Sequence, residues 1–404
     1  MDPARASIDL ATKIANAVST VSAQPWEILT ERNPDGGRTF EAADIARLQQ
    51  IRSEYATLSM RGNVFCFREA FDYPGFSINE YCRDLHPNPV GESINLKIQA
   101  WSESHGIWIP GISEHCHDIA AFLHPEAGED RFIAVAKCLS VDWYLNDSIG
   151  REWAPTMSPA GQANAMALRE HIVEISRAMK VAPDAPLIDK ACVEMLLEMQ
   201  ALSGHPTWFS RFLEMWIGHV QRSCGNINAE NLGQVPDVFT YLQNSPHQSG
   251  LYYTLAHFEF SRDEYLDWST LTEYCLASDV RNLCWLCALI GGLSNDLISF
   301  EKEFVTHQSQ SNFVVVLMLN YPALTLGEVV EAIMMILRDL MEHFVTLSGA
   351  LKNRCAGRHG TPAFRATGIF VQAVEWGIMT TWVWQTRSQR YQHARSIFRE
   401  TQQG

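Results

Sequence analysis

The sequence predicts an all-α protein whose helices enclose an apolar space, and three observations support this fold class. From residue 71 onward, amphipathic or apolar segments are separated by short breaks that contain Pro, Gly and Asn. Alternating strand patterns are nearly absent, and no repeat of fixed period is present. Of the 404 residues 47% are hydrophobic, and the 12 Trp, 19 Phe and 11 Tyr can line a cavity as well as fill a core.

Apolar residues spaced at i, i+3 and i+4 predict the individual helices. Four are expected at residues 166–180, 186–202, 208–223 and 263–276. Thr325 and Glu328 form a capping-box pattern before another amphipathic run, and a last long helix is expected over residues 363–399. Near the start we expect a short helix over residues 8–21 and then a turn-rich linker, ERNPDGGRTF, at residues 31–40.

The charge and the cysteine content argue against several classes of site. A formal net charge of -15 does not provide the cationic surface that nucleic acids require, so no nucleic-acid partner is expected. The ten cysteines are scattered and do not resemble a disulfide framework. Cys284 and Cys287 form a C-x-x-C within an apolar helical run, which indicates buried thiols. Residues 115–118, HCHD, are adjacent on a helix and therefore point in different directions, which disfavours a metal site.

The N-terminal residues predict neither export nor membrane insertion. The first twenty residues contain no apolar h-region and no cleavage pattern, which argues against a signal peptide. No run of eighteen apolar residues occurs, so no membrane span is expected. The sequence therefore predicts a cytoplasmic protein.

The stretch CALIGGLSNDLISFEKE, at residues 287–303, changes abruptly from apolar to polar. Asn295, Ser299 and Glu303 are spaced at i, i+4 and i+8 and share one helix face, on which Lys302 also lies. An amide oxygen, a hydroxyl and a carboxylate stacked over two turns suit Mg²⁺ rather than zinc. The lysine can hold a phosphate oxygen that the metal also contacts. The pattern predicts a metal-phosphate site at the end of a buried helix.

Two further groups of polar residues are candidates for the same site. Asp142 and Asn146, at i and i+4, follow the apolar stretch FIAVAKCLSV, and Asp147 lies one step round the helix. This group is ordinary for a helix end, but it becomes a plausible second wall opposite the 295–303 segment. Near the C-terminus, Arg390 offers a fork of donors to a phosphate and Tyr391 adds a hydroxyl.

Several of these motifs resemble those of class I terpene synthases of the microbial type. NDLISFEKE is similar to their N-D-x-x-S-x-x-K-E motif, DWYLND resembles a variant of their aspartate-rich motif, and SQRY resembles their C-terminal Arg-Tyr pair. Trp384 falls where that family often has an aromatic wall residue, and residues 86–108 resemble the entry to the catalytic domain. The resemblance covers about residues 71–404, which it implies are the catalytic domain. Residues 1–70 are then a partly helical N-terminal extension of unclear role.

The resemblance implies a helical bundle around an apolar, aromatic-lined cavity, capped by a site for probably three Mg²⁺ ions and diphosphate. It implies metal binding by Asp142, perhaps with Asp147 or Asn146, and by Asn295, Ser299 and Glu303. Lys302, Arg390 and Tyr391 would hold the diphosphate, and Trp384 would face the carbocation. The implied activity is that of a carbon–oxygen lyase, which ionises an acyclic prenyl diphosphate such as farnesyl or geranylgeranyl diphosphate and cyclises it to a terpene hydrocarbon or alcohol.

Two positions depart from the family pattern. Val141 precedes Asp142 and Trp143 follows it, so one carboxylate of the usual aspartate pair is missing. In YLQNSPHQSG, Gly250 fits the family's glycine at a helix break, but no arginine precedes it to sense diphosphate. His247 is then the nearest substitute donor, with one N–H against five in a guanidinium. We expect slower ionisation, or a different trigger, than is usual in the family.

Two rival functions follow from the same residues. A non-catalytic or weakly active homologue that binds prenyl diphosphate is compatible with the altered aspartate and arginine positions. A chain-elongating prenyltransferase is less expected, because such enzymes normally carry a second aspartate-rich motif where this chain has the asparagine-serine-glutamate pattern. The expected partner is the prenyl diphosphate substrate, and a homodimer is left open.

Overall fold

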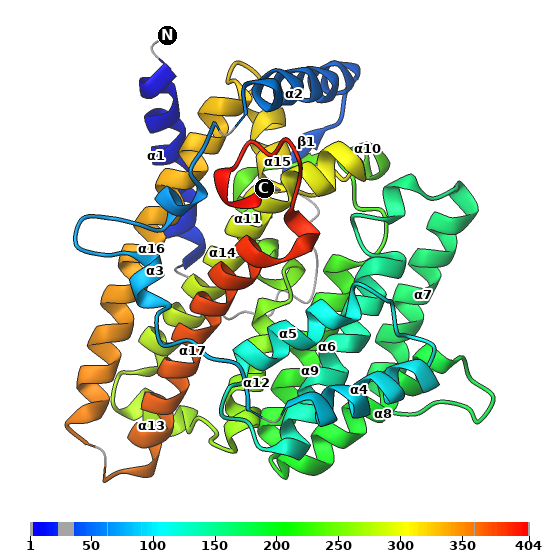
Figure 1. Ribbon diagram of the computed structural model, residues 1–404, viewed down its shortest axis with the longest axis vertical. Coiled ribbons are helices and arrows are strands. Elements are labelled where there is room, and N and C mark those ends of the chain that lie inside the picture. The colour runs from blue at the N-terminus through cyan, green and yellow to red at the C-terminus, as the bar shows by residue number, and fades with distance from the viewer. Residues whose placement is uncertain (1–2, 23–35, 63, 90, 359, 403–404) are drawn as a thin grey trace.

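The protein is almost entirely α-helical, as the sequence predicts (Figure 1). The computed structural model describes residues 3–22, 36–62, 64–89, 91–358 and 360–402. The α-helices are α1 Pro3–Ser22, α2 Ala42–Arg61, α3 Ile78–Tyr81, α4 Gly91–Ser104, α5 Ser113–Leu123, α6 Glu129–Ile149, α7 Pro159–Ala178, α8 Leu187–Ser203, α9 Pro206–Ser223, α10 Ala229–Leu232, α11 Val238–Gln248, α12 Leu251–Arg262, α13 Trp268–Glu273, α14 Ala277–Phe300, α15 Phe313–Asn320, α16 Leu326–Ala356 and α17 Pro362–Arg387. Within the described residues, the strands β1 Gly37–Thr39 and β2 Gln234–Pro236 form one antiparallel pair.

Helix α14 is the centre of the core and carries half of the candidate site at its C-terminal end. It packs against α11, α12, α16 and α17. By length and composition the segment Ala277–Thr306 could cross a membrane, but 94% of its most apolar window is buried inside the protein. A helix that is apolar all round is expected in such a core position. The thiols of Cys284 and Cys287 lie in this core and form no disulfide, as predicted.

The N-terminal residues pack onto the same core. Helix α1 contacts α11 and α16, and α2 contacts α15 and α16. Ile14 of α1 and Ile51 of α2 are fully buried in these contacts. The helix expected over residues 8–21 is therefore confirmed. Residues 31–35 of the expected linker lie outside the described residues, and residues 37–39 form β1 instead of a turn. The domain boundary at residue 70 stays a prediction.

Two expected helices are shorter than the sequence pattern indicated. Of residues 263–276 only α13 is helical, because Asp263 takes a left-handed conformation (φ 53°) that ends α12. The carboxylate of Asp267 then accepts hydrogen bonds from the backbone N–H groups of Ser269 and Thr270 and caps the new helix. The last long helix ends at Arg387 and not at residue 399.

The chain beyond α17 continues as a 3₁₀ turn, η4 (Gln389–Tyr391), and an irregular strap to residue 402. Two carboxylates, one buried and one half-buried, fasten this strap to distant parts of the chain. Glu301, at the end of α14, accepts a hydrogen bond from the backbone N–H of Ile397 (2.7 Å). Glu400 accepts one from the backbone N–H of Phe67 (2.8 Å). The strap thus holds Arg390 and Tyr391 against the C-terminal end of α14.

Candidate active site

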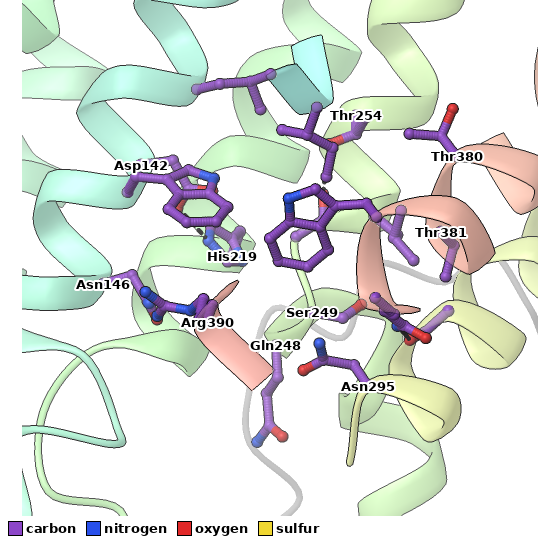
Figure 2. Close-up of a pocket in the computed structure, with 18 of the residues that line it drawn as sticks. Asp142, Asn146, His219, Gln248, Ser249, Thr254, Asn295, Thr380, Thr381 and Arg390 are labelled. Carbon is purple, nitrogen blue, oxygen red and sulfur yellow. Dashed lines mark hydrogen bonds and ion pairs between the residues drawn. The ribbon is translucent and has the colours of Figure 1, made fainter. Parts of the chain in front are cut away.

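One cavity lies between the second half of α6, the start of α12 and the C-terminal ends of α14 and α17 (Figure 2). Its volume is about 160 Å³, so the space between these helices is not filled by side chains. Asp142 of α6 lines one wall, and Asn295 of α14 lines another with Glu303, which follows α14. The two groups of residues predicted to face each other therefore share one cavity. Their roles as metal ligands stay predictions.

Asp142 is held by two hydrogen bonds from neighbouring helices. Its Oδ1 lies 2.7 Å from Nε2 of His219, and its Oδ2 accepts a hydrogen bond from the hydroxyl of Tyr253 (2.5 Å). Nδ1 of His219 lies 2.6 Å from the backbone carbonyl of His247, so both ring nitrogens face acceptors. Burial opposes protonation of His219, but the charge and the hydrogen bond of Asp142 outweigh it and raise the pKa of the imidazole. His219 therefore fixes the orientation of the Asp142 carboxylate and was missed in the sequence.

Asp147 does not reach the cavity. Its carboxylate accepts hydrogen bonds from Nη2 of Arg390 (2.9 Å) and from the indole N–H of Trp153 (2.9 Å), and its side chain is 2% exposed. Asn146, the alternative second ligand, lines the cavity and donates a hydrogen bond to Glu152 (3.3 Å). The structure therefore brings Asn146, and not Asp147, to the wall beside Asp142.

On the opposite wall the predicted trio is only partly brought together. Asn295 and Glu303 line the cavity, whereas Ser299 is buried outside the lining and donates its hydroxyl to the backbone carbonyl of Asn295 (2.6 Å). The expectation of one continuous α-helical face is wrong beyond residue 300. Residues Glu301–Thr306 form a π-helical segment, η3, and such segments often mark functional sites. This change of helix type alters the register that a strict i+4 spacing assumes.

The amide of Asn295 is oriented by the Arg-Tyr segment. Its Nδ2 donates a hydrogen bond to the hydroxyl of Tyr391 (2.9 Å), which leaves its Oδ1 as an acceptor for a ligand. Glu303 accepts a hydrogen bond from Nδ2 of Asn312 (3.0 Å). Burial raises the pKa of Glu303, and Arg151 acts in the opposite direction. The wall therefore offers an amide oxygen and a carboxylate to the cavity.

Three cationic side chains lie at this polar part of the cavity: the buried Arg151 and the largely buried Lys302 and Arg390. Lys302 and Arg390 both contact the carboxylate of Glu152, which no sequence pattern identified. These two cations hold the pKa of Glu152 far below its ordinary value, although burial alone would raise it. Burial and the charge of Arg390 lower the pKa of Lys302, and Glu152 opposes this shift.

Arg151 was also missed in the sequence. Its guanidinium donates a hydrogen bond to the backbone carbonyl of Ser311 (2.8 Å) and lies 3.6 Å from Asp296 and 3.8 Å from Glu303. It also donates to the side chain of Gln248 (3.3 Å), at the end of α11. The only sequence signal is its place directly after Gly150, where the aspartate-rich helix ends. Arg151 therefore supplies a guanidinium on the side of the cavity where the sequence lacks the expected arginine.

Of the two residues expected to contact the diphosphate, Gly250 lines the cavity and His247 does not. Gly250 lines the cavity at the break between α11 and α12, with φ 76°, as expected. A Cβ at this position would lie only 3.1 Å from a ring carbon of Tyr253, so only glycine fits. The ring of His247, however, lies outside the cavity lining against Tyr252. Burial and the charge of Arg222 lower the pKa of His247 to about 3, so the ring is neutral.

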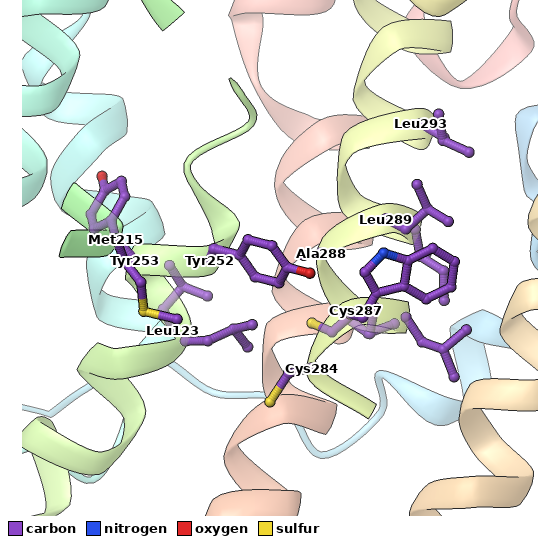
Figure 3. Close-up of a cluster of buried hydrophobic side chains, with 14 of the residues drawn as sticks. Leu123, Met215, Tyr252, Tyr253, Cys284, Cys287, Ala288, Leu289 and Leu293 are labelled. Atoms are coloured by element: carbon purple, nitrogen blue, oxygen red, sulfur yellow. The ribbon is translucent and has the colours of Figure 1, made fainter. Parts of the chain in front are cut away.

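The remaining lining is apolar and aromatic. The indole rings of Trp143 and Trp384 meet edge to face with centroids 5.5 Å apart, and Trp384 meets Tyr391 in the same way at 5.2 Å. Arg390 lies over the ring of Trp143 (5.0 Å). Figure 3 shows the core beside the cavity, where Leu123 and Tyr253, both lining residues, lie among other buried side chains. The position of Trp384 in the lining agrees with the predicted aromatic wall. Trp384 lies on α17, whereas Tyr391 lies beyond the end of this helix.

The donor set suits a hard divalent cation that is bound together with an anion. Carboxylate and amide oxygens are the ligands that Mg²⁺ prefers. Among the described side chains no group of three His, Cys, Asp or Glu forms a metal cluster by itself. Mg²⁺ typically takes few protein ligands and shares its shell with substrate phosphates, so this arrangement fits Mg²⁺ bound with diphosphate. The candidate ligands are Asp142, Asn295 and Glu303.

Comparisons with known proteins agree with this site. Residues 158–343 match the family described as terpene synthase family 2, C-terminal metal binding. This part of the chain is therefore similar to the metal-binding part of terpene synthases. The matched residues run from the start of α7 into α16 and include Asn295, Lys302 and Glu303. Asp142 and Arg390 lie outside the match.

Several solved structures share the fold of this chain. A variant of cucumene synthase aligns with a TM-score of 0.60 and 15% identity, over 76% of this chain and 98% of the other. The structure of α-eudesmol synthase aligns with a TM-score of 0.59 and 15% identity, over 76% and 97%. A structure titled hedycaryol apo gives 0.58 and 17%, over 74% and 95%. No curated protein matches the chain.

Proposed function

We propose that the protein is a terpene cyclase that ionises an acyclic prenyl diphosphate and cyclises the resulting carbocation. The observation that carries this proposal is the shared cavity, which joins hard-oxygen groups and buried cations to an apolar, aromatic lining. The polar groups suit a diphosphate and the apolar lining suits a prenyl chain. We take farnesyl and geranylgeranyl diphosphate as the first candidates.

The charges around the cavity explain why the anion would need metal ions. Among the described residues, the polar part holds the cationic side chains Arg151, Lys302 and Arg390, and Asp142 raises the pKa of His219. Five carboxylates contact these cations, namely Asp142, Asp147, Glu152, Asp296 and Glu303. Because these carboxylates already pair with the cations, a diphosphate would need additional positive charge to enter with it.

Asp142, Asn295 and Glu303 would hold Mg²⁺, by family analogy three ions with the diphosphate. Bound Mg²⁺ would take up the negative charge that develops on the diphosphate as it leaves. Lys302, Arg390 and the hydroxyl of Tyr391 would hold diphosphate oxygens, and Arg151 would add a guanidinium in place of the missing sensor arginine.

The apolar part of the cavity would determine the fate of the carbocation. Exclusion of water prevents immediate capture of the cation, and the shape of the cavity then selects the ring closure. The faces of Trp143 and Trp384 can stabilise positive charge that passes close to them. In the closed site the strap beyond α17 would keep Arg390 and Tyr391 over the leaving group.

Product analysis tests the proposed activity. The purified full-length protein is incubated with Mg²⁺ and, separately, with C10, C15 and C20 prenyl diphosphates. We expect a cyclic terpene hydrocarbon or alcohol from at least one substrate, with release of diphosphate that stops when EDTA removes the metal. A longer prenyl diphosphate would indicate chain elongation instead. Tight binding of every substrate without any product would indicate a non-catalytic homologue and would contradict the proposal.

A further inference from the structure

Glu152 lies directly between the two cations that would hold the diphosphate. Its carboxylate contacts the ammonium of Lys302 through both oxygens, at 2.9 Å (Oε1) and 2.6 Å (Oε2). Its Oε1 also accepts a hydrogen bond from Nη2 of Arg390 (2.8 Å) and one from Nδ2 of Asn146 (3.3 Å). The side chain of Glu152 is only 5% exposed.

These contacts use the donors that a bound diphosphate would need. Lys302, Arg390 and Glu152 all line the cavity, so an anion that enters competes with Glu152 for the same N–H groups. We propose that Glu152 is an internal substitute for the substrate diphosphate. In the ligand-free site its carboxylate binds Lys302 and Arg390, and a diphosphate that enters displaces the carboxylate from both cations. This inference rests on the proposed function.

The pairing of Glu152 with both cations has a physical reason in the ligand-free protein. Two buried cations close together repel each other, and burial of each is costly without a partner. A carboxylate from the chain satisfies both and keeps Lys302 and Arg390 in their binding positions. The same carboxylate is then an obstacle, because a diphosphate must displace it and afterwards lies next to its negative charge. Divalent cations bound beside Asn295 and Glu303 would offset this repulsion.

Glu152 therefore links diphosphate binding to the presence of metal. In the wild-type protein, inorganic diphosphate alone should bind poorly because the displaced carboxylate repels it. With Mg²⁺ the repulsion is offset and diphosphate should bind. A glutamine at position 152 has nearly the same shape but no charge, so it neither competes strongly for the cations nor repels the anion. Glu152→Gln should therefore bind diphosphate with less dependence on Mg²⁺ than the wild type.

Calorimetric titration of inorganic diphosphate into the full-length protein, with and without Mg²⁺, tests this inference. We expect Glu152→Gln to bind diphosphate without Mg²⁺ at least about tenfold more tightly than the wild type, since the variant removes a like charge from beside the anion. The melting temperature without ligand should fall, because Lys302 and Arg390 lose their shared carboxylate, and diphosphate should raise it more than in the wild type.

Glu259→Gln is the matched control for removal of a buried, ion-paired carboxylate. Glu259 is 3% exposed, pairs with Arg211 and lies outside the cavity lining. This variant should also lose thermal stability, but its affinity for diphosphate should equal that of the wild type. A gain in affinity in both variants would show a general charge effect and would contradict the inference.

The remaining outcomes separate the inference from the proposed function. Weaker or unchanged binding in Glu152→Gln, where the wild type binds diphosphate with Mg²⁺, overturns the role of Glu152 and leaves the proposed function standing. Failure of the wild type to bind diphosphate even with Mg²⁺ overturns both. If Glu152→Gln does not fold, Glu152→Asp provides the test, because its shorter side chain weakens the contacts. Glu152→Asp should also bind diphosphate more tightly than the wild type, but by a smaller factor than Glu152→Gln. Weaker or unchanged binding in Glu152→Asp overturns the inference.

Discussion

Replacement of Asn295 with leucine is expected to lower kcat about 10²- to 10³-fold, which is typical for the loss of one group that stabilises charge in a transition state. Leucine has the same branching pattern, although it is larger, and offers no oxygen to the cavity and no N–H to Tyr391. The variant therefore loses both a proposed metal ligand and the contact that orients the Arg-Tyr segment. Steady-state kinetics with the substrate identified by product analysis measure the effect.

The neighbouring residue provides a control on the same helix. Ser294 is fully buried, does not line the cavity, and donates its hydroxyl to the backbone carbonyl of Gly291 (3.1 Å). Ser294→Ala should keep kcat within about twofold of the wild type, since it removes one ordinary hydrogen bond. Equal activity in Asn295→Leu and Ser294→Ala would show that the amide of Asn295 has no part in the reaction.

Replacement of Arg151 with methionine is expected to lower the free energy of unfolding by about 3–5 kcal/mol, the cost of breaking a buried ion pair by removal of one partner. Asp296 is 2% exposed and Glu303 is 3% exposed, and Arg151 is the guanidinium that contacts both. Burial raises the pKa of Asp296 to about 7, and Arg151 acts against this shift. Without Arg151 two carboxylates would be left close together in a dry environment.

A second substitution distinguishes this charge effect from lost packing. In the double variant Arg151→Met, Asp296→Asn, one of the two carboxylates is neutral, and its neighbour Tyr241 can still donate a hydrogen bond to the amide oxygen. We expect the double variant to recover part of the lost stability in urea unfolding. If it is less stable than Arg151→Met alone, the repulsion between Asp296 and Glu303 is not the source of the loss.

The sequence predicts the fold and most of the helices well because burial leaves a clear periodic pattern. Helix α14 is apolar on all sides, and the structure places it in the middle of the core. The end of α17 was harder to predict, since the residues after Arg387 are compatible with a helix and only the cap at Ser388 turns the chain into η4. The capping box at Thr325 and Glu328 was read correctly because both partners are adjacent in sequence.

The site was predicted less completely because its contacts join residues far apart in the chain. Asp142, Asn295 and Glu303 follow apolar runs and could be recognised as polar ends of buried helices. Glu152 has no such pattern, and its role depends on Lys302, which is 150 positions away. The pairing of Asp147 with Arg390, over 243 positions, was invisible for the same reason.

The role of Ser299 as a metal ligand stays a prediction, although its side chain lies outside the cavity lining. A strict α-helix would place its hydroxyl on the face that Asn295 and Glu303 share. The π-helical segment begins at Glu301 and alters the register of Glu303, whereas Ser299 still lies within α14 and donates its hydroxyl to the backbone carbonyl of Asn295. The sequence contains no Pro or Gly at this point that would signal the change.

Anomalous diffraction from crystals grown with Mn²⁺ and inorganic diphosphate tests the central claim most directly. Mn²⁺ accepts the same oxygen ligands as Mg²⁺ and can be located by its own scattering. We predict Mn²⁺ peaks in the cavity between Asp142 on one wall and Asn295 and Glu303 on the other, with diphosphate bound to Lys302 and Arg390. Diphosphate bound in this cavity with no Mn²⁺ beside these residues, or Mn²⁺ bound only elsewhere on the protein, would contradict the account.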